Sequence, residues 1–346
     1  MAEYKGIKGF KVQSLASDPS LVEGQIWYNS TSFTLKYLAL PAGAWASGGN
    51  LNQLKQKLAG AGTQTDALCM AGFVGPPAPG VYVTANVETY NGSAWTEGAN
   101  LLQYRQAASG AGTVSTAALC VGGDTYPQAG IANAESYNGT SWTEGNNLAG
   151  VGRWNMAGMG TQTAAIMTGG QSKPNGAAQN ESLTETWNGT SWSETNNLNT
   201  AREFMGGSGT STDAVIFGGN TSTSPDPGHS DLTESWNGTS WTELADLNTA
   251  RKGGGASWGG TSTSALYFGG FYNAPPDTRT AACEQWNGTS WTEVADLAGG
   301  TVYMGSAGTT SAALSFGGQT VSSGPTMTLG TEEWTQALAA KTVTTS

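Results

Sequence analysis

Charged residues are scarce in this chain. Its 346 residues include 14 lysines and arginines and 25 aspartates and glutamates, which is 11% where about 25% is usual. The formal net charge is −11 at pH 7. Proteins that bind DNA or RNA neutralise phosphates with clustered Lys and Arg, so the composition argues against a nucleic-acid partner.

Histidine and cysteine are also rare. His229 is the only histidine, which excludes a histidine metal cluster, and its turn-rich loop predicts that it is exposed to solvent. Asp226 and Asp231 lie close to it, but they lack the alternating oxygen ligands of a calcium loop. The three cysteines cannot form a closed disulfide framework, so we expect free thiols. We expect no metal, no cofactor and no enzymatic activity, because convergent titratable groups are missing.

Long apolar segments are missing as well. No stretch approaches the roughly 20 apolar residues that a membrane-spanning helix needs. The first residues lack the apolar core of a secretory signal. We therefore expect a chain that is made in the cytoplasm and does not insert into a membrane.

Glycine, in contrast, is abundant and regularly placed. A Gly-Gly pair, Ala-Gly in the first repeat, recurs every 47 to 51 residues, and its second residue falls at Gly72, Gly123, Gly170, Gly219, Gly270 and Gly318. A variable loop and an aromatic residue follow each pair, and in the first five repeats Asn-Gly and then Ser-Trp-Thr-Glu or a variant of it come next. Self-similarity at this period is typical of propellers and solenoids, so the repeat predicts the architecture.

Each repeat predicts four short strands. A small, glycine-rich strand such as residues 108–113 suits a crowded interior, and an apolar run such as residues 214–217 suits burial on both faces. The third and fourth strands form a hairpin, in which Asn188-Gly189 predicts a tight primed turn because both residues tolerate positive φ. Four antiparallel strands in each of six units favour a propeller.

The order of Gly-Gly, aromatic residue and Trp resembles the kelch motif over residues 40–338. The resemblance implies a six-bladed, kelch-like β-propeller. The last repeat lacks its fourth strand after Trp334, whereas residues 44–51 match residues 94–101. We therefore expect the N-terminal side to complete the sixth blade and to cover two sheet edges.

Two further features recur in each repeat. A basic residue precedes the first strand, and its regularity predicts an ion pair or a backbone anchor in each blade; these residues are Lys55, Arg105, Arg153, Arg202 and Arg251. An acid follows most Trp-Thr pairs, at Glu97, Glu144, Glu243 and Glu293, and is too regular to mark a single active site.

Residues 1–39 lie outside the repeat. Their Ser-Asp-Pro turn is followed by Gly-Gln-Ile-Trp-Tyr-Asn-Ser-Thr-Ser, which predicts a β-hairpin with its turn at residues 29–32. This segment resembles N-terminal elements of virion proteins of tailed bacteriophages, especially those with Asn-Gly-Thr-Ser-Trp repeats. The resemblance implies a virion-attachment segment, with Tyr4, Phe10, Trp27 and Tyr28 as attachment residues. The alternative is a hairpin that packs on the outer edge of the first blade. Residues 339–346 remain as a C-terminal tail.

The loops after the Gly-Gly pairs differ in length and sequence between repeats. Long loops on a rigid scaffold commonly carry binding sites, and Tyr82, Tyr126, Phe271 and Tyr272 are the candidate binding residues in them. Neutral drift on a solvent-exposed face explains the variation equally well.

The resemblance implies a non-enzymatic structural protein on the exterior of a phage particle. We expect a tail fibre, an appendage or a surface-decorating adhesin, present in multiple copies, that contacts other virion proteins through residues 1–39 and a host receptor or glycan through the loops. Two alternatives stay open: a cellular kelch-like adaptor that binds a protein partner, and a glycan-binding propeller.

Overall fold

The computed structural model describes residues 12–19, 25–39, 42–75, 82–126, 130–174, 176–222, 228–272, 278–321, 326–337 and 339–343. Every regular element in these residues is a β-strand, which confirms the predicted all-β class. They contain no helix with the length and apolar character needed to cross a membrane. The chain divides into two compact units: unit 1 comprises Met1–Gly43 with Thr335–Ser346, and unit 2 comprises Ala44–Trp334.

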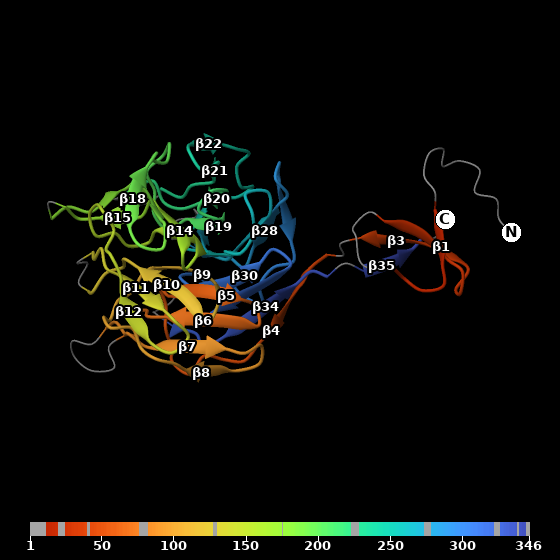
Figure 1. The fold of residues 1–346 in the computed structure, drawn as a ribbon, viewed down its shortest axis with the longest axis horizontal. Helices are drawn as coiled ribbons and strands as arrows, with labels where there is room; N and C mark the ends of the chain where they lie inside the picture. The colour runs from red at the N-terminus through yellow and green to blue at the C-terminus, as the bar shows by residue number, and fades with distance from the viewer. Residues whose placement is uncertain are drawn as a thin grey trace. The chain divides into compact units, whose positions relative to one another are not determined.

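Within the described residues, unit 2 contains six four-stranded sheets that share one strand order. The first sheet contains β5 (Ala59–Thr63), β6 (Asp66–Met70), β7 (Val87–Tyr90) and β8 (Trp95–Glu97), and the second contains β9 (Ser109–Val114), β10 (Ala117–Val121), β11 (Ala134–Tyr137) and β12 (Trp142–Glu144). The third sheet contains β13 (Ala157–Thr161), β14 (Ala164–Thr168), β17 (Thr184–Trp187) and β18 (Trp192–Thr195), and the fourth contains β19 (Gly206–Gly209), β20 (Ala214–Phe217), β21 (Thr233–Trp236) and β22 (Trp241–Glu243). The fifth sheet contains β24 (Gly255–Ala256), β25 (Ala265–Phe268), β28 (Cys283–Trp286) and β29 (Trp291–Val294), and the sixth contains β30 (Gly305–Thr309), β31 (Ala312–Phe316), β34 (Thr331–Thr335) and β4 (Ala44–Ser47). Figure 1 shows the first strands β5, β9, β19 and β30 toward the middle of unit 2 and the fourth strands β8, β12, β18 and β22 at its periphery.

Glycine in the first strands permits neighbouring sheets to approach closely. A Cβ atom added at Gly110 of β9 would lie 2.0 Å from the carbonyl oxygen of Gly60 in β5. A Cβ added at Gly60 would lie 2.1 Å from the carbonyl oxygen of Ser306 in β30. No side chain fits at such distances, which explains the predicted glycine-rich inner strand.

The second strands supply the hydrophobic core. Every residue of β20 and of β25 is buried, as the apolar runs predict. Apolar clusters lie between successive sheets: Phe217 of the fourth sheet packs against Tyr267 of the fifth at 5.2 Å between ring centroids. Trp95 of the first sheet packs against Phe316 of the sixth at 4.8 Å. Burial of these large side chains is the main source of stability in unit 2.

The sixth sheet takes its fourth strand from the other end of the unit. Strand β4 lies beside β34, as the match between residues 44–51 and 94–101 predicts. The Gly48 amide donates to the Thr331 carbonyl at 2.8 Å. Trp45 of β4 packs against Phe268 and Trp334, with ring centroids 4.8 Å and 5.6 Å apart. The outer edge of β34 is therefore covered.

The repeated Asn-Gly turn differs from the predicted two-residue primed turn. Trp187 pairs with Trp192, so four residues, Asn-Gly-Thr-Ser, connect the two strands. Only Gly189 adopts a positive φ, at 90°. The Asn188 side-chain oxygen accepts hydrogen bonds at 2.9 Å from the amides of Thr190 and Ser191. The prediction of positive φ at both residues was wrong, because the asparagine stabilises the loop through its side chain.

The variable loops contain short ladders of their own. These are the pair β15 (Gln171–Ser172) and β16 (Gln179–Asn180), the three strands β23 (Arg251–Lys252), β26 (Phe271–Tyr272) and β27 (Thr278–Arg279), and the pair β32 (Gln319–Val321) and β33 (Thr326–Met327).

Unit 1 contains one mixed sheet. Strand β1 (Gln13–Leu15) pairs in parallel with β2 (Ile26–Asn29), and β2 forms the predicted hairpin with β3 (Thr34–Ala39). Residues 339–346 were predicted to form a C-terminal tail, but β35 (Ala339–Thr342) pairs antiparallel with β3. Both ends of the chain thus contribute strands to the same sheet.

Candidate functional site

The basic residue of each repeat forms a buried ion pair. We call the equivalent residues Lys55, Arg105, Arg153, Arg202, Arg251 and Thr301 the anchor positions. Five of them pair with a glutamate of the third strand of the same sheet: Glu88, Glu135, Glu185, Glu234 and Glu284. The predicted ion pair is therefore confirmed in these five repeats. The acids that follow Trp-Thr, such as Glu97, are exposed.

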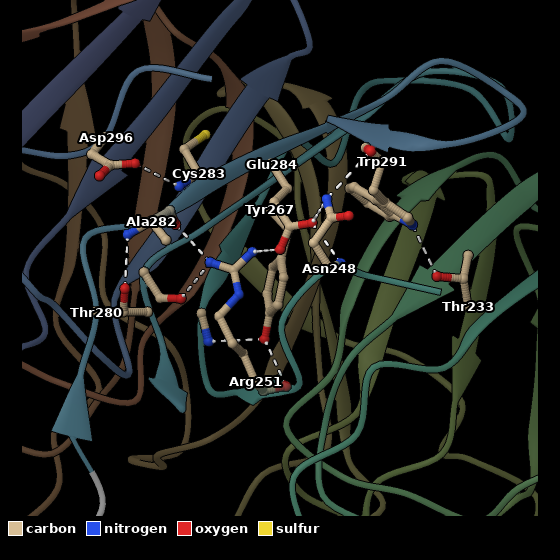
Figure 2. Close-up of polar contacts among 12 residues, drawn as sticks. Thr233, Asn248, Arg251, Tyr267, Thr280, Ala282, Cys283, Glu284, Trp291 and Asp296 are labelled. Carbon is tan, nitrogen blue, oxygen red and sulfur yellow. Dashed lines mark hydrogen bonds and ion pairs between the residues drawn. The ribbon is translucent and has the colours of Figure 1, made fainter. Parts of the chain in front are cut away.

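The fifth repeat illustrates how an anchor works (Figure 2). Arg251 Nη2 donates to Glu284 Oε1 at 2.8 Å, and Nη1 donates to the Ala282 carbonyl at 2.6 Å and to that of Gly269 at 3.2 Å. Glu284 Oε2 in turn accepts the backbone amide of Asn248 at 2.8 Å. One guanidinium thereby holds together the Gly-Gly turn, the end of the variable loop and the third strand. The role of the anchor is therefore structural.

Two residues after each anchor, the backbone forms a cycle of hydrogen bonds. We call these residues the ring positions: Lys57, Ala107, Asn155, Phe204, Gly253 and Tyr303. Each amide donates to the carbonyl of the ring residue in the preceding sheet at 2.7–3.0 Å, and the Lys57 amide donates to the Tyr303 carbonyl. The six bonds therefore return to their starting point, and each sheet contributes one donor and one acceptor.

Every ring position has a left-handed backbone, with φ between 53° and 67°. Glycine adopts this conformation without strain, yet it occurs only at Gly253. For a bulky residue such as Phe204 or Tyr303 the conformation costs on the order of 1–3 kcal/mol. Since glycine would serve the backbone better, five of these side chains are retained at an energetic cost. Residues held in this way cluster at functional sites.

Four of the ring residues, Lys57, Asn155, Phe204 and Tyr303, line a cavity of about 340 Å³, which we call the central cavity. Its walls also include the residues between the anchor and ring positions and the first residues of the variable loops. The lining residues are Gln56, Lys57, Phe73, Gln106, Asp124, Tyr126, Trp154, Asn155, Gln171, Glu203, Phe204 and Tyr303. The lining of the central cavity thus combines amide side chains, carboxylates, one ammonium group and aromatic rings.

Two buried carboxylates are held by amide groups. Glu203 accepts from Asn155 Nδ2 at 2.8 Å and from Gln171 Nε2 at 3.1 Å, and burial raises the pKa of its carboxyl group despite these bonds. Asp124 accepts from Gln106 Nε2 at 3.2 Å and from the Tyr126 amide at 2.7 Å. The two carboxylates are therefore fixed in orientation.

Three further polar groups of the cavity have unused hydrogen-bonding capacity. Within the part of the chain that the structure describes, Lys57 forms no ion pair, and burial lowers the pKa of its ammonium group although Asp124 and Glu203 oppose this shift. Lys57 Nζ lies 5.4 Å from the centroid of the Tyr303 ring. Gln56 Oε1 and Gln106 Oε1 are buried without a hydrogen-bond donor.

One of the predicted binding residues, Tyr126, lines this cavity, and a second, Tyr82, packs against it. The two rings are tilted with centroids 4.7 Å apart, and they lie 6.3 Å and 6.2 Å from the Phe73 ring. Tyr126 and Phe73 line the cavity, Tyr126 is 44% exposed, and its φ of 56° is also left-handed. The first and second variable loops thus build one aromatic wall.

The other two predicted binding residues form β26. Phe271 is buried and packs edge-to-face against Tyr303, with ring centroids 5.5 Å apart. Tyr272 is the backbone partner of Arg251 in the ladder between β26 and β23. Tyr303 reaches Phe204 at 5.1 Å between centroids. Gly253 stands between them in the ring, and a Cβ there would lie 3.1 Å from Tyr303. The glycine therefore leaves room for this second aromatic wall.

Below the ring, Trp258 narrows the interior of unit 2. It lines a smaller cavity of about 80 Å³ together with Lys57, Phe204 and Tyr303, and also a cleft of about 10 Å³ between the first strands. The other five repeats have a glycine at the position of Trp258, for example Gly160 and Gly308. Trp258 Nε1 donates to Ser306 Oγ at 2.6 Å. Trp258 therefore lies beside Lys57, Phe204 and Tyr303, which line both the smaller and the central cavity.

The remaining candidate residues lie elsewhere. Trp27 is fully buried in the sheet of unit 1 and Tyr28 is half-buried, whereas Tyr4 and Phe10 lie outside the described residues. His229 is half-buried and bridges to Asn220, so the prediction of an exposed histidine was wrong. In the described ranges, no group of three His, Cys, Asp or Glu side chains could hold a metal ion.

The three cysteines are free and buried, as predicted. Burial raises the pKa of Cys69 to about 11 and the pKa values of Cys120 and Cys283 to about 12. All three are therefore protonated near neutral pH and act as small core residues.

Sequence reasoning missed most of the cavity. The ring positions were not recognised, although a signal exists: two residues after each anchor, the residue type changes in every repeat. Trp258 in place of a repeated glycine is a second signal. The third-strand glutamates were also not predicted, although a glutamate stands two residues before the turn aromatic in all six repeats, from Glu88 to Glu332.

Comparisons with known proteins inform the fold alone. A scan against models of protein families finds no match to this chain, and a search of curated proteins finds none. Among solved structures, the structure of YjhT is similar with a TM-score of 0.65 and 14% sequence identity, and the match covers 84% of this chain and 99% of YjhT. The similarity supports an all-β, β-propeller-like fold and carries no functional assignment.

Proposed function

We propose that the six sheets of unit 2 are the blades of one closed, kelch-like β-propeller. The cycle of hydrogen bonds through the ring positions supports closure, since it passes once through each sheet. Strand β4 beside β34 supports a closing blade built from both sides of the repeat array. The anchor positions support equivalent blades, because five of six contain the same buried ion pair.

We further propose that this propeller is a non-enzymatic binding component on the exterior of a tailed-phage particle, where it presents its central cavity and loops to a host receptor or glycan. The observation that carries the binding role is the ring of strained, non-repeated side chains around the central cavity. A purely structural ring would favour glycine at all six positions. The assignment to a virion rests on the resemblance of residues 1–39.

Attachment to the particle is assigned to unit 1. Ile26 and Tyr37 are exposed cross-strand partners in this small sheet, and Phe33 is exposed in the turn between β2 and β3. Exposed apolar side chains that gather on a small sheet provide contact area for a protein partner. Other virion proteins would therefore contact this surface.

The test is the incorporation of a variant into particles. In the full chain, Ile26→Ser, Phe33→Ser and Tyr37→Ser are combined, and purified particles are analysed by quantitative mass spectrometry. We expect the unchanged chain in particles and at least a tenfold lower copy number for the variant. The matched control combines Leu102→Ser with Tyr104→Ser, two exposed apolar residues of unit 2, and should be incorporated normally. Absence of the unchanged chain from particles would refute the virion role.

A further inference from the structure

We propose that the central cavity binds one neutral hexose unit at the end of a glycan. This inference rests on the proposed binding role and specifies its ligand. It follows from the hydrogen-bonding capacity, the charge, the aromatic walls and the size of the cavity.

The hydrogen-bonding capacity requires a ligand that both donates and accepts. Gln56 Oε1 and Gln106 Oε1 are more than nine-tenths buried and need donors. Lys57 Nζ carries three donor hydrogens and needs acceptors. A hydroxyl group does both, whereas a phosphate group only accepts and an ammonium group only donates. The cavity therefore suits a ligand with several hydroxyl groups.

The charge of the lining residues disfavours an acidic ligand. Asp124 and Glu203 contribute two carboxylates and Lys57 one ammonium group, so the lining carries a formal charge of −1 when all three are ionised. A carboxylate on the ligand would meet two acids at short range in a partly desolvated site, where repulsion is stronger than in water. An acidic sugar is therefore disfavoured.

The aromatic walls and the size match a sugar ring. Phe73 and Tyr126 form one wall, and Phe204 and Tyr303 form another. The C–H face of a pyranose carries slight positive charge and packs on the electron-rich face of an aromatic ring. A volume of about 340 Å³ is at the small end of the range for ligand sites. A single sugar unit fits these limits better than a protein segment.

The test uses the purified full chain and simple probes. Methyl glycosides of glucose, galactose and mannose are titrated by saturation-transfer NMR and calorimetry, together with the methyl glycoside of glucuronic acid. We expect at least one neutral hexoside to bind with a Kd on the order of 1 mM, and the glucuronide to bind at least about tenfold more weakly. Stronger binding of the glucuronide, or no binding of any neutral hexoside, would overturn the inference.

A variant places the sugar in the cavity. Lys57→Met removes a half-buried donor without an ion pair among the described residues, so the fold should persist, and thermal unfolding checks this. We expect at least about a tenfold loss of hexoside affinity. Lys341→Met, at an exposed lysine of unit 1, is the matched control and should bind normally. Unchanged affinity of the folded Lys57→Met variant would exclude the cavity as the site. These results concern the purified chain, so they are independent of incorporation into particles.

Discussion

The anchor and ring positions are two residues apart in every repeat and differ completely in how they vary. The anchors are arginine in four repeats and lysine in a fifth, and their partner is always a third-strand glutamate. The ring residues are of six different types in six repeats. The difference is what the proposed function requires: equivalent sheets need equivalent anchors, whereas an asymmetric ligand would need a different group from each sheet.

The largest expected effect comes from breaking one anchor. Arg202→Met leaves Glu234 as an uncompensated buried charge and removes the donor to the carbonyls of Gly218 and Leu232. We expect the free energy of unfolding to fall by about 3–5 kcal/mol, measured by urea denaturation.

Arg202→Lys is the matched control for this change. It keeps the ion pair, as Lys55 does with Glu88 at 3.0 Å, and should cost less than Arg202→Met. Hexoside binding by both folded variants should equal that of the unchanged chain. A loss of binding without a loss of stability would show that the anchors take part in recognition, and the proposed division between the two positions would fail.

A smaller effect is expected from the Asn-Gly turn, another repeated feature. Replacing Asn188-Gly189 with two alanines removes the two hydrogen bonds to Asn188 Oδ1 and forces alanine to a φ near 90°. We expect a loss of about 1–3 kcal/mol in unfolding free energy, with unchanged hexoside affinity. Equal stability of variant and parent would mean that this repeated turn has no structural role.

The smallest effect is expected at the ring itself. Ala107 has a φ of 53°, so Ala107→Gly relieves backbone strain and should raise the free energy of unfolding by on the order of 1 kcal/mol. Urea denaturation of the variant beside the parent measures this difference. A destabilised variant would show that the ring backbone is not strained, which would remove the argument that its side chains are retained for binding.

The repeat, the strands and the anchor were predictable because each leaves a local or periodic pattern. A buried run such as β20 is readable from its apolar residues, and Arg202 is recognisable because its equivalents recur. The left-handed backbone at Phe204 and Tyr303 was not predictable, since neither residue type favours that conformation. It is imposed by hydrogen bonds between sheets that are distant in sequence.

The candidate site was predictable only in part. Tyr82 and Tyr126 were identified from the loops that contain them, and the structure places them together at the cavity. Glu203 and Asp124 escaped notice because each owes its position to amide partners that are distant in sequence, such as Asn155 and Gln106. The pairing of β35 with β3 is equally long-range, and four residues are too few for a strand pattern to be recognised.

That pairing has a mechanical consequence. Because β3 and β35 are neighbours, a tensile load applied between the two ends of the chain acts on their hydrogen bonds before it reaches the strands of unit 2. Lys36 pairs with Thr342, near the C-terminal end of the chain, and Ala39 pairs with Ala339 at the other end of the two strands. The Lys36–Thr342 pair would therefore open first, and the remaining pairs would follow in turn. Under a pulling force, the sheet of unit 1 would therefore open before the sheets of unit 2, and the repeats would stay folded until it had opened.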